Sequence, residues 1–434
     1  MRFRCGVLAL LLLLLPAAGR ALIDESAYRS YEGKSIVTIT FTGNNSTRDF
    51  IIEREIGLAA GDAFSTAKFA EGVQNLENLG IFGSIVPVIE ERPDGVALEY
   101  QFREMPSFIP YLALSYTEEN GFSVGPALSS VNLFGRAITV SAQTLFGGIT
   151  TFELMVKYPW ITGDYHMGLD LVANHLVRDD DLAGFEETSD EFSPWIKRYI
   201  GESGRVRAMA GYFHMKADRD EITLSPDRTD QFFRIGAAVG HDTRDSWRDP
   251  RDGWENEVEF LGTFGDGDFA TATVDIRRFQ RVNEKHTLFV GALTSLRAGT
   301  VGKDVPEYLQ YRMGGANSIR GQDVDLGKML YGKNQLITTV EYQISVLPLR
   351  PYNFFRWSAA VGLQLALFND TGIAWSTSDE FSTDRTKTGF GVGLRLLVPG
   401  SEMVRFDIGF NRQGDVFFHL GGGFKWTAQR LRLR

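Results

Sequence analysis

Beyond residue 108, the chain is a succession of segments in which apolar and polar residues alternate. Such alternation places apolar side chains on one face of an extended strand and polar side chains on the other. The pattern is clear at 151–159, 255–264 and 336–346. A sheet with one apolar face buries that face against a second sheet or turns it to lipid. The region is therefore either a water-soluble sandwich or a transmembrane barrel.

The N-terminus favours the barrel. Arg2 and Arg4 precede an apolar run at 7–15 and a small-residue stretch ending near residue 21. This order predicts a cleaved secretory signal over 1–21, whose apolar core is too short to span a bilayer as a helix. The single cysteine, Cys5, lies inside the signal, so the exported chain has no disulfide.

Segment ends and segment number also favour the barrel. About 320 residues at roughly 20 per strand and connection predict about 16 strands over 108–426, the even number that a bacterial barrel requires. Aromatic residues lie at the ends of the alternating segments: Tyr158, Trp160, Trp254, Trp357, Trp375 and Trp426.

The net charge of −10 argues against nucleic acid as a partner.

A different pattern precedes the barrel, at 35–104. Strand-like alternation at 36–41 is followed by two segments with helical spacing and by two more strands at 85–90 and 96–102. Ser46 or Thr47 is predicted to cap the first helix, and the second is expected to begin at Ser65 and end at Gly80. The pattern predicts one small α+β domain of about 70 residues, near the lower size limit for an independent core.

Connection lengths in the barrel region divide into two classes. Tight turns are expected at 147–148 and 265–268, and long connections at 178–194, 217–230 and 300–333. Tight turns on one side and long loops on the other are typical of outer-membrane barrels. The longest connection holds a lone Arg320, and around it lie Gly314, Gly315, Ile319 and Gly321.

Strand parity identifies candidate partners for this arginine. In 357–370, Asp370 has the parity opposite to that of Trp357, Val361, Leu363, Leu365 and Leu367, so it is expected to face the lumen. By the same count Glu341 faces the lumen on the preceding strand. If the loop folds into the barrel, Arg320 reaches these two carboxylates, with which a guanidinium pairs well. The alternative leaves Arg320 on the cell surface and the lumen charges solvated. Glycines at 314, 315 and 321 favour the inward loop because they permit tight turns.

Motifs for catalysis are missing from the sequence. There is no Gly-x-Ser-x-Gly elbow and no Walker-type phosphate loop, and the six histidines are scattered without the spacing of metal ligands. We therefore predict that the protein is not an enzyme and uses no metal or cofactor.

Five segments carry recognisable motifs. They are 75–82 in the module, His241-Asp242-Thr243-Arg244-Asp245 with Pro250 and Gly253, Ile319-Arg320-Gly321, Phe368-Asn369-Asp370-Thr371-Gly372 with Trp375, and 389–409 with Arg405-Phe406-Asp407. These segments and their order resemble the BamA/TamA superfamily of outer-membrane assembly and translocation proteins. The module resembles a POTRA domain, and the resemblance implies a mostly β protein: a 16-stranded antiparallel transmembrane β-barrel preceded by one small α+β POTRA domain that lies in the periplasm.

The resemblance also implies a role for the loop. In this family the loop tucks into the barrel and its arginine engages acidic residues of the inner wall, which here correspond to Glu341 and Asp370. The chain departs from the family at Gln322, where an aromatic residue is usual. The ion pair tolerates this change, but packing of a ring against the wall is lost, so we expect a lower affinity of the loop for the wall.

The implied function is insertion of other β-barrels into the bacterial outer membrane. The POTRA domain captures extended substrates by strand addition, and a seam between the first and last strands, near 109–116 and 416–426, opens sideways. Gly421, Gly422 and Gly423 make the last strand pliable. The expected partners are unfolded outer-membrane or secreted proteins, outer-membrane lipid and accessory periplasmic lipoproteins. The alternatives are a translocation pore for a soluble exoprotein, as in two-partner secretion, and a passive porin-like channel.

Overall fold

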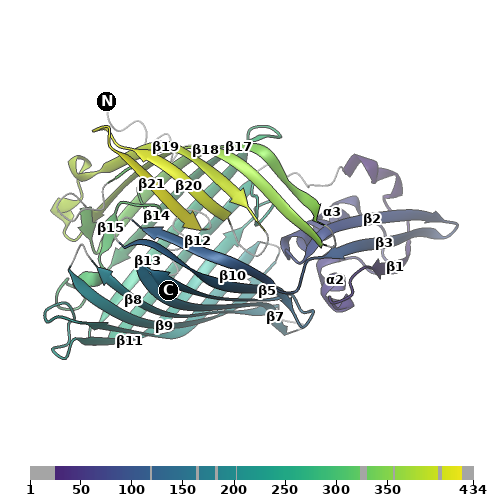
Figure 1. Ribbon diagram of the computed structural model, residues 1–434. Coiled ribbons are helices and arrows are strands. Elements are labelled where there is room, and N and C mark those ends of the chain that lie inside the picture. Colours follow the sequence, from purple (N-terminus) through teal and green to yellow (C-terminus); the bar gives the residue numbers. More distant parts are fainter. Residues whose placement is uncertain are drawn as a thin grey trace.

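The protein consists of a large strand barrel with a small module of helices and strands at one end (Figure 1). The computed structural model describes residues 25–117, 120–162, 166–180, 184–201, 203–322, 330–354, 357–398 and 403–422. The predicted signal at 1–21, Gly423 and Trp426 lie outside these residues. Across the described ranges, no helix is long and apolar enough to cross a bilayer. We call the end of the barrel beside the N-terminal module the module end, and the other end the far end.

The N-terminal module has the predicted order of elements. Its sheet has the order β1-β3-β2, with β1 parallel and β2 antiparallel to β3. Helix α3 carries Phe69, Val73 and Leu76 at helical spacing, and all three are buried in one core with Leu98 and Tyr100 of β3. The elements are β1 (Ile36–Thr42), α2 (Asp49–Ile56), α3 (Thr66–Asn78), β2 (Phe82–Arg92) and β3 (Gly95–Glu104).

The prediction that Ser46 or Thr47 caps α2 is wrong. The N-cap residue is Arg48, and its side chain makes no capping hydrogen bond. The amides of Ser46 and Thr47 donate instead to the carboxylate of Glu104, at 2.9 and 2.6 Å. Glu104 reaches them from the end of β3, so tertiary contact replaces the local cap. The second helix does begin after Ser65.

The barrel is a single sheet of sixteen strands, which confirms the predicted number. Each strand pairs antiparallel with its neighbour in the sheet, and the sheet runs from β4 to β21. The strands are β4 (Ile109–Thr117), β5 (Gly121–Leu133), β6 (Ile138–Gly147), β7 (Ile149–Thr162), β8 (Met167–Asp180), β9 (Phe185–Ile200), β10 (Gly204–Ala217), β11 (Thr229–Asp242), β12 (Gly253–Gly265), β13 (Phe269–Arg281), β14 (His286–Arg297), β17 (Asn334–Phe354), β18 (Trp357–Trp375), β19 (Lys387–Leu397), β20 (Met403–Phe410) and β21 (Val416–Gly422).

Burial alternates along the strands as the sequence pattern predicts. On β12, Val258 and Phe260 are exposed on the outer surface, whereas Glu257 and Glu259 are buried towards the lumen. The predicted long connection at 178–194 is wrong, because β8 continues to Asp180 and β9 begins at Phe185. Glu187 and Glu191 occupy alternate buried positions of β9 that face the lumen, and Glu187 forms an ion pair with Arg178 at 2.7 Å.

The connection between β14 and β17, at 298–333, turns back into the lumen from the far end. It contains the short strands β15 (Tyr311–Met313) and β16 (Leu330–Gly332), which pair with each other. Ile319 is fully buried in a cluster with Ile337 of β17 and Ile373 of β18. This apolar contact holds the middle of the loop against the inner wall.

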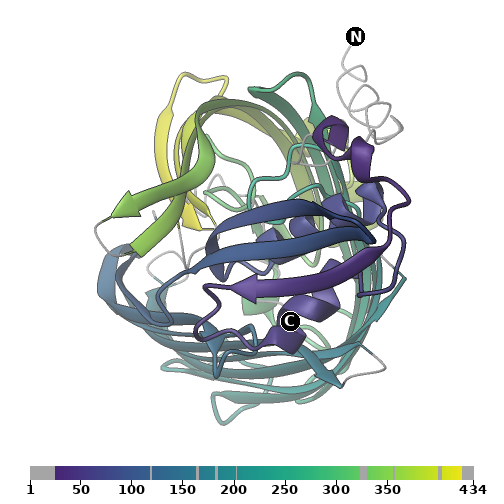
Figure 2. The same ribbon diagram turned by 90° about the vertical axis from the view of Figure 1, so that its right-hand side faces the viewer.

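The module lies across the mouth of the barrel, as the view along the barrel shows (Figure 2). A cavity of about 1960 Å³ occupies the lumen. Loop residues between 308 and 317 line this cavity, and so do Arg54 of α2 and Asn75 and Asn78 of α3. The loop and the module therefore bound the same internal space from opposite ends.

Hydrogen bonds fix the module to the turn between β5 and β6. The amide of Arg48 donates to the carbonyl of Gly135 at 3.1 Å. The buried side chain of Asn132 donates to Thr47 Oγ1 at 2.8 Å and accepts the amide of Ala137 at 2.9 Å. Both the nitrogen and the oxygen of the Asn132 side-chain amide are hydrogen-bonded, so replacing this residue would leave buried polar groups without those partners.

The segment 243–252, which connects β11 to β12 at the module end, joins the module to the wall at β18 and β19. The Trp247 amide donates to Asn78 Oδ1 of α3 at 3.2 Å. The Arg248 guanidinium donates to carbonyls at the module ends of β18 and β19, and Gln364 of β18 donates to Asp249 at 2.6 Å. Burial raises the pKa of the Asp249 carboxyl. This segment therefore crosses the mouth and contacts both the module and β18.

Candidate functional site

The loop arginine lies inside the barrel against the two predicted carboxylates. Arg320 is fully buried, and its Nε and Nη2 donate to the two oxygens of Asp370 at 2.8 and 3.0 Å. Its Nη1 donates to Glu341 at 2.9 Å, and its backbone amide also donates to Asp370 at 3.1 Å. The structure thus brings all three residues together in a bidentate, charge-assisted arrangement.

Further charged residues complete a charge cluster that the sequence reasoning did not assign. Arg395 of β19 donates to Glu341 at 2.7 Å and to Asp407 of β20 at 2.6 Å, and Asp407 also accepts from Arg320 at 3.3 Å. The cluster contains three arginines and three carboxylates and is therefore balanced in formal charge. Parity along β19 and β20 would have placed Arg395 and Asp407 inward. The charge cluster consists of Arg320, Glu341, Asp370, Arg395, Arg405 and Asp407.

An aromatic ring of the wall stacks against the loop arginine. The guanidinium carbon of Arg320 lies 3.5 Å from the ring centroid of Phe368, a cation–π contact. Gly391 leaves space for this ring, because a Cβ there would lie 2.6 Å from Phe368 Cζ. Gln322 donates its side-chain amide to the carbonyl of Thr388. The aromatic partner of Arg320 therefore belongs to β18, and the expected lower affinity of the loop stays a prediction.

The main chain of the loop packs directly on the main chain of β19 and β20. A Cβ at Gly389 would lie 1.7 Å from the carbonyl oxygen of Arg320, and one at Gly409 would lie 2.4 Å from the amide of Gly321. Gly321 itself has φ +84°, which favours glycine. Of the other predicted glycines, Gly315 has φ +81° and Gly314 donates its amide to Ser318 at 2.7 Å. Glycines thus allow the close approach that the buried arginine requires.

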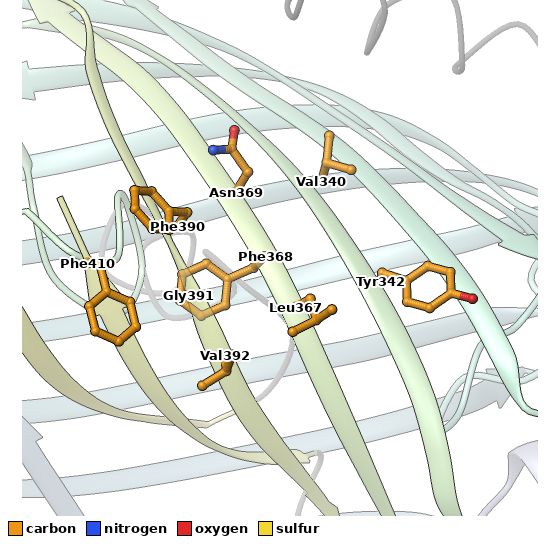
Figure 3. Close-up of a pocket in the computed structure, with 9 residues that line it drawn as sticks. All are labelled: Val340, Tyr342, Leu367, Phe368, Asn369, Phe390, Gly391, Val392 and Phe410. Carbon is orange, nitrogen blue, oxygen red and sulfur yellow. The ribbon is translucent and has the colours of Figure 1, made fainter. Parts of the chain in front are cut away.

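The outer face of the same wall carries an apolar groove of about 360 Å³ (Figure 3). Phe368 contributes to this groove and contacts Arg320 on the lumen side. Phe368 therefore lies between the outer groove and the charge cluster. The residues that line the groove are Val340, Tyr342, Leu367, Phe368, Asn369, Phe390, Gly391, Val392 and Phe410.

The two ends of the barrel sheet meet at a seam between β4 and β21. Among the residues that the structure describes, these strands are neighbours but share no backbone pairing. The lumen cavity is lined at the seam by inward-facing Ala113 and His419 and also by outward-facing Leu114 and Phe418. Side chains of both faces of the sheet therefore border the cavity at the seam.

The predicted seam glycines lie at the end of β21, although Gly423 is outside the described residues. A Cβ at Gly421 would lie 2.7 Å from Nη2 of Arg405. Gly421 therefore leaves room for an arginine of the charge cluster. Whether these glycines also make β21 pliable stays a prediction.

Comparison with known families agrees with this architecture. The POTRA family, described as the surface antigen variable number repeat, matches residues 35–105. The family described as the Omp85 superfamily domain matches residues 132–426, which is more than half of the chain. The chain belongs to the Omp85 superfamily. The resemblance noted from the sequence motifs is confirmed.

Curated Omp85 relatives carry the name outer membrane protein assembly factor BamA. The relative from Nitratidesulfovibrio vulgaris is 27% identical over 406 residues, covering 85% of this chain and 47% of that protein. The relative from Neisseria meningitidis is 30% identical over 415 residues, covering 80% of this chain and 48% of that protein. The chain thus spans about half the length of the curated relatives it matches.

Solved structures share the fold at low sequence identity. BamA from Haemophilus ducreyi lacking POTRA domains 1–3 matches with a TM-score of 0.57 and 16% identity, covering 90% of this chain and 83% of that chain. CdiB from Escherichia coli matches with a TM-score of 0.59 and 14% identity, covering 89% and 76%. Family and fold together indicate the bacterial outer membrane, with the POTRA module on the periplasmic side.

Proposed function

We propose that this Omp85 protein inserts β-barrel proteins into the outer membrane through the seam between β4 and β21. The observation that carries the proposal is that β4 and β21, over their described residues, lie beside each other at the lumen cavity without backbone pairing. An unpaired edge offers amides and carbonyls to an incoming strand. In lipid each unsatisfied backbone group costs several kcal/mol, so an open seam gains free energy when a client strand pairs with it.

The POTRA module offers such a client a first contact at the edge of its sheet. Strand β2 lies at one edge of the three-stranded sheet and is 11 residues long. Val86 near its middle is exposed, and β2 lies beside β18 of the barrel. We infer that an extended client adds to this sheet by main-chain hydrogen bonds, which give affinity without strict sequence choice.

The arrangement of the lumen supports a lateral route over an axial one. Loop residues line the far end of the cavity, and α2 and α3 line the module end. Passage along the axis would require the loop to leave a wall to which Arg320 is tied by ion pairs with three carboxylates. Passage through the seam does not require Arg320 to lose those partners.

The proposed partners follow from this route. The clients are unfolded outer-membrane proteins, and outer-membrane lipid contacts the apolar outer surface. Accessory periplasmic lipoproteins remain a prediction from the family resemblance. Translocation of a soluble exoprotein is the alternative function, and it uses the same barrel.

Depletion of the protein followed by a quantitative census of outer-membrane and secreted proteins tests the proposal. We expect a broad fall in outer-membrane β-barrel proteins and recovery when the wild-type chain is restored. Loss of one secreted protein with normal levels of barrel proteins would establish translocation instead. Normal levels of both groups would contradict both functions.

A further inference from the structure

We propose that His419 ties the last barrel strand to the tip of the inward loop, so that the loop and the seam move together. His419 lies on β21, and its Nε2 accepts a hydrogen bond from the backbone amide of Gly321 at 3.1 Å. The imidazole is 6% exposed and lines the lumen cavity at the seam. His419 is therefore a positioning residue that acts on the seam through the loop.

The hydrogen bond is directed from a fixed donor. Gly321 follows Arg320, whose backbone amide and side chain both bind Asp370. A Cβ on Gly409 would lie 2.4 Å from the Gly321 amide nitrogen, and a Cβ on Gly321 would lie 2.5 Å from the Phe410 carbonyl oxygen. Since Nε2 is the acceptor, the imidazole carries no proton on that nitrogen and is neutral in this arrangement.

The strand that receives this bond lies at one end of the barrel sheet. Within the described part of the chain, β21 pairs with β20 alone, and its other edge faces β4 without backbone pairing. The bond from Gly321 therefore links β21 to the loop in addition to the ladder that joins it to β20.

The consequence is reciprocal coupling. If β21 swings away from β4, it must break the bond to Gly321 or pull the loop tip with it. If the loop leaves the wall, β21 loses the same bond, and each event lowers the cost of the other by the same factor. A role of this coupling in client insertion rests on the proposed lateral opening, but the coupling between the loop and β21 exists without any client.

Hydrogen exchange of the purified protein in lipid nanodiscs tests the tie directly and needs no insertion activity. In His419→Leu we expect amides of 416–422 to exchange about tenfold faster than in wild type, as loss of one buried hydrogen bond implies. His419→Gln, which offers an oxygen acceptor, should restore much of the protection. Phe418→Leu, on the outward face of the same strand, is the matched control and should change exchange at Gly321 little. Unchanged exchange in His419→Leu would overturn the proposal.

A double-mutant cycle separates coupling from simple loss of packing. Arg320→Lys keeps the charge but loses the bidentate contact, so in a chain with His419 it should raise exchange both in the loop and at 416–422. In the His419→Leu background, Arg320→Lys should raise exchange in the loop only. Independent effects on the two segments would overturn the proposal. If His419→Leu yields no barrel, Arg320→Lys alone still decides, because faster exchange in the loop without any change at 416–422 excludes the tie.

Discussion

Replacement of Arg320 by alanine should release the inward loop from a barrel that still forms. The guanidinium is fully buried, and it binds Asp370 through two nitrogens, Glu341 through a third contact and Asp407 through a fourth. Its removal leaves Glu341 and Asp407 with Arg395, whereas Asp370 loses its bidentate arginine contact while Thr339 still donates to it at 2.6 Å. Asp370 is therefore the carboxylate that loses most of its charge compensation.

The magnitude follows from the cost of leaving a buried charge uncompensated. Removing one partner of a buried ion pair typically costs about 3 to 5 kcal/mol. The stacking of Arg320 on Phe368 adds about 1 to 2 kcal/mol at a desolvated site. A loss of about 4 kcal/mol corresponds to nearly a thousandfold increase in the population of the undocked loop.

Hydrogen exchange of residues 311–322 and heat-modifiability on gels measure this loss. Arg320→Ala should show much faster exchange across the loop and unfold at a lower temperature, with reduced insertion of client barrels. Arg320→Ala combined with Asp370→Asn removes the orphaned charge and should recover part of the protection. The reasoning is refuted if Arg320→Ala leaves loop exchange and gel mobility unchanged, or if the second substitution worsens the loss additively.

Three further predictions concern the close packing and the module. Gly389→Ala should undock the loop, because the new Cβ would lie 1.7 Å from the Arg320 carbonyl oxygen. Gly262→Ala is the control and should leave hydrogen exchange of the loop normal, because its Cβ meets chiefly the Phe264 ring, which can rotate. Asn132→Ala should weaken docking of the module by about 1 to 3 kcal/mol, because it removes two buried hydrogen bonds. The measurement is hydrogen exchange of the amides at 46–48, which should become faster. Unchanged exchange would contradict the prediction. Burial, Arg54 and Lys197 lower the pKa of His166 from 6.5 to about 4, so the docked state disfavours its protonation, and lowering the pH from 7 to 5 should lower the protection factors of the α2 amides, once the intrinsic exchange rate at each pH is divided out. His166→Asn should abolish that pH dependence, and an equal pH response in this variant would contradict the assignment.

Strand parity was sufficient to predict the inward carboxylates. Glu341 lies between the outward-facing Val340 and Tyr342, and Asp370 has the parity opposite to that of Leu365 and Leu367, so the direction of both carboxylates follows from the period of two. The same rule applies to Arg395 and Asp407. Their roles were not predicted because the partner of a lumen charge is set by the register of strands and by the path of the loop, and neither is visible in local sequence.

Contacts between distant segments account for the other misses. The amides of Ser46 and Thr47 bind Glu104, more than 50 residues away, so a local capping signal gave the wrong partner. His419 had no ligand spacing in the sequence, yet the fold places it beside Gly321. The connection predicted at 178–194 is mostly strand, because the polar lumen accommodates the acidic side chains of Glu187 and Glu191.

A disulfide across the seam tests the central claim most directly. Cys5 is the single cysteine of the sequence and lies in the predicted signal, so a cysteine at Ser115 of β4 can be scanned against cysteines at 417–421 of β21 without interference. The account predicts that the crosslinked protein keeps its fold but fails to insert client barrels, and that reduction of the disulfide restores insertion. Normal insertion by the fully crosslinked protein would contradict lateral opening of the seam.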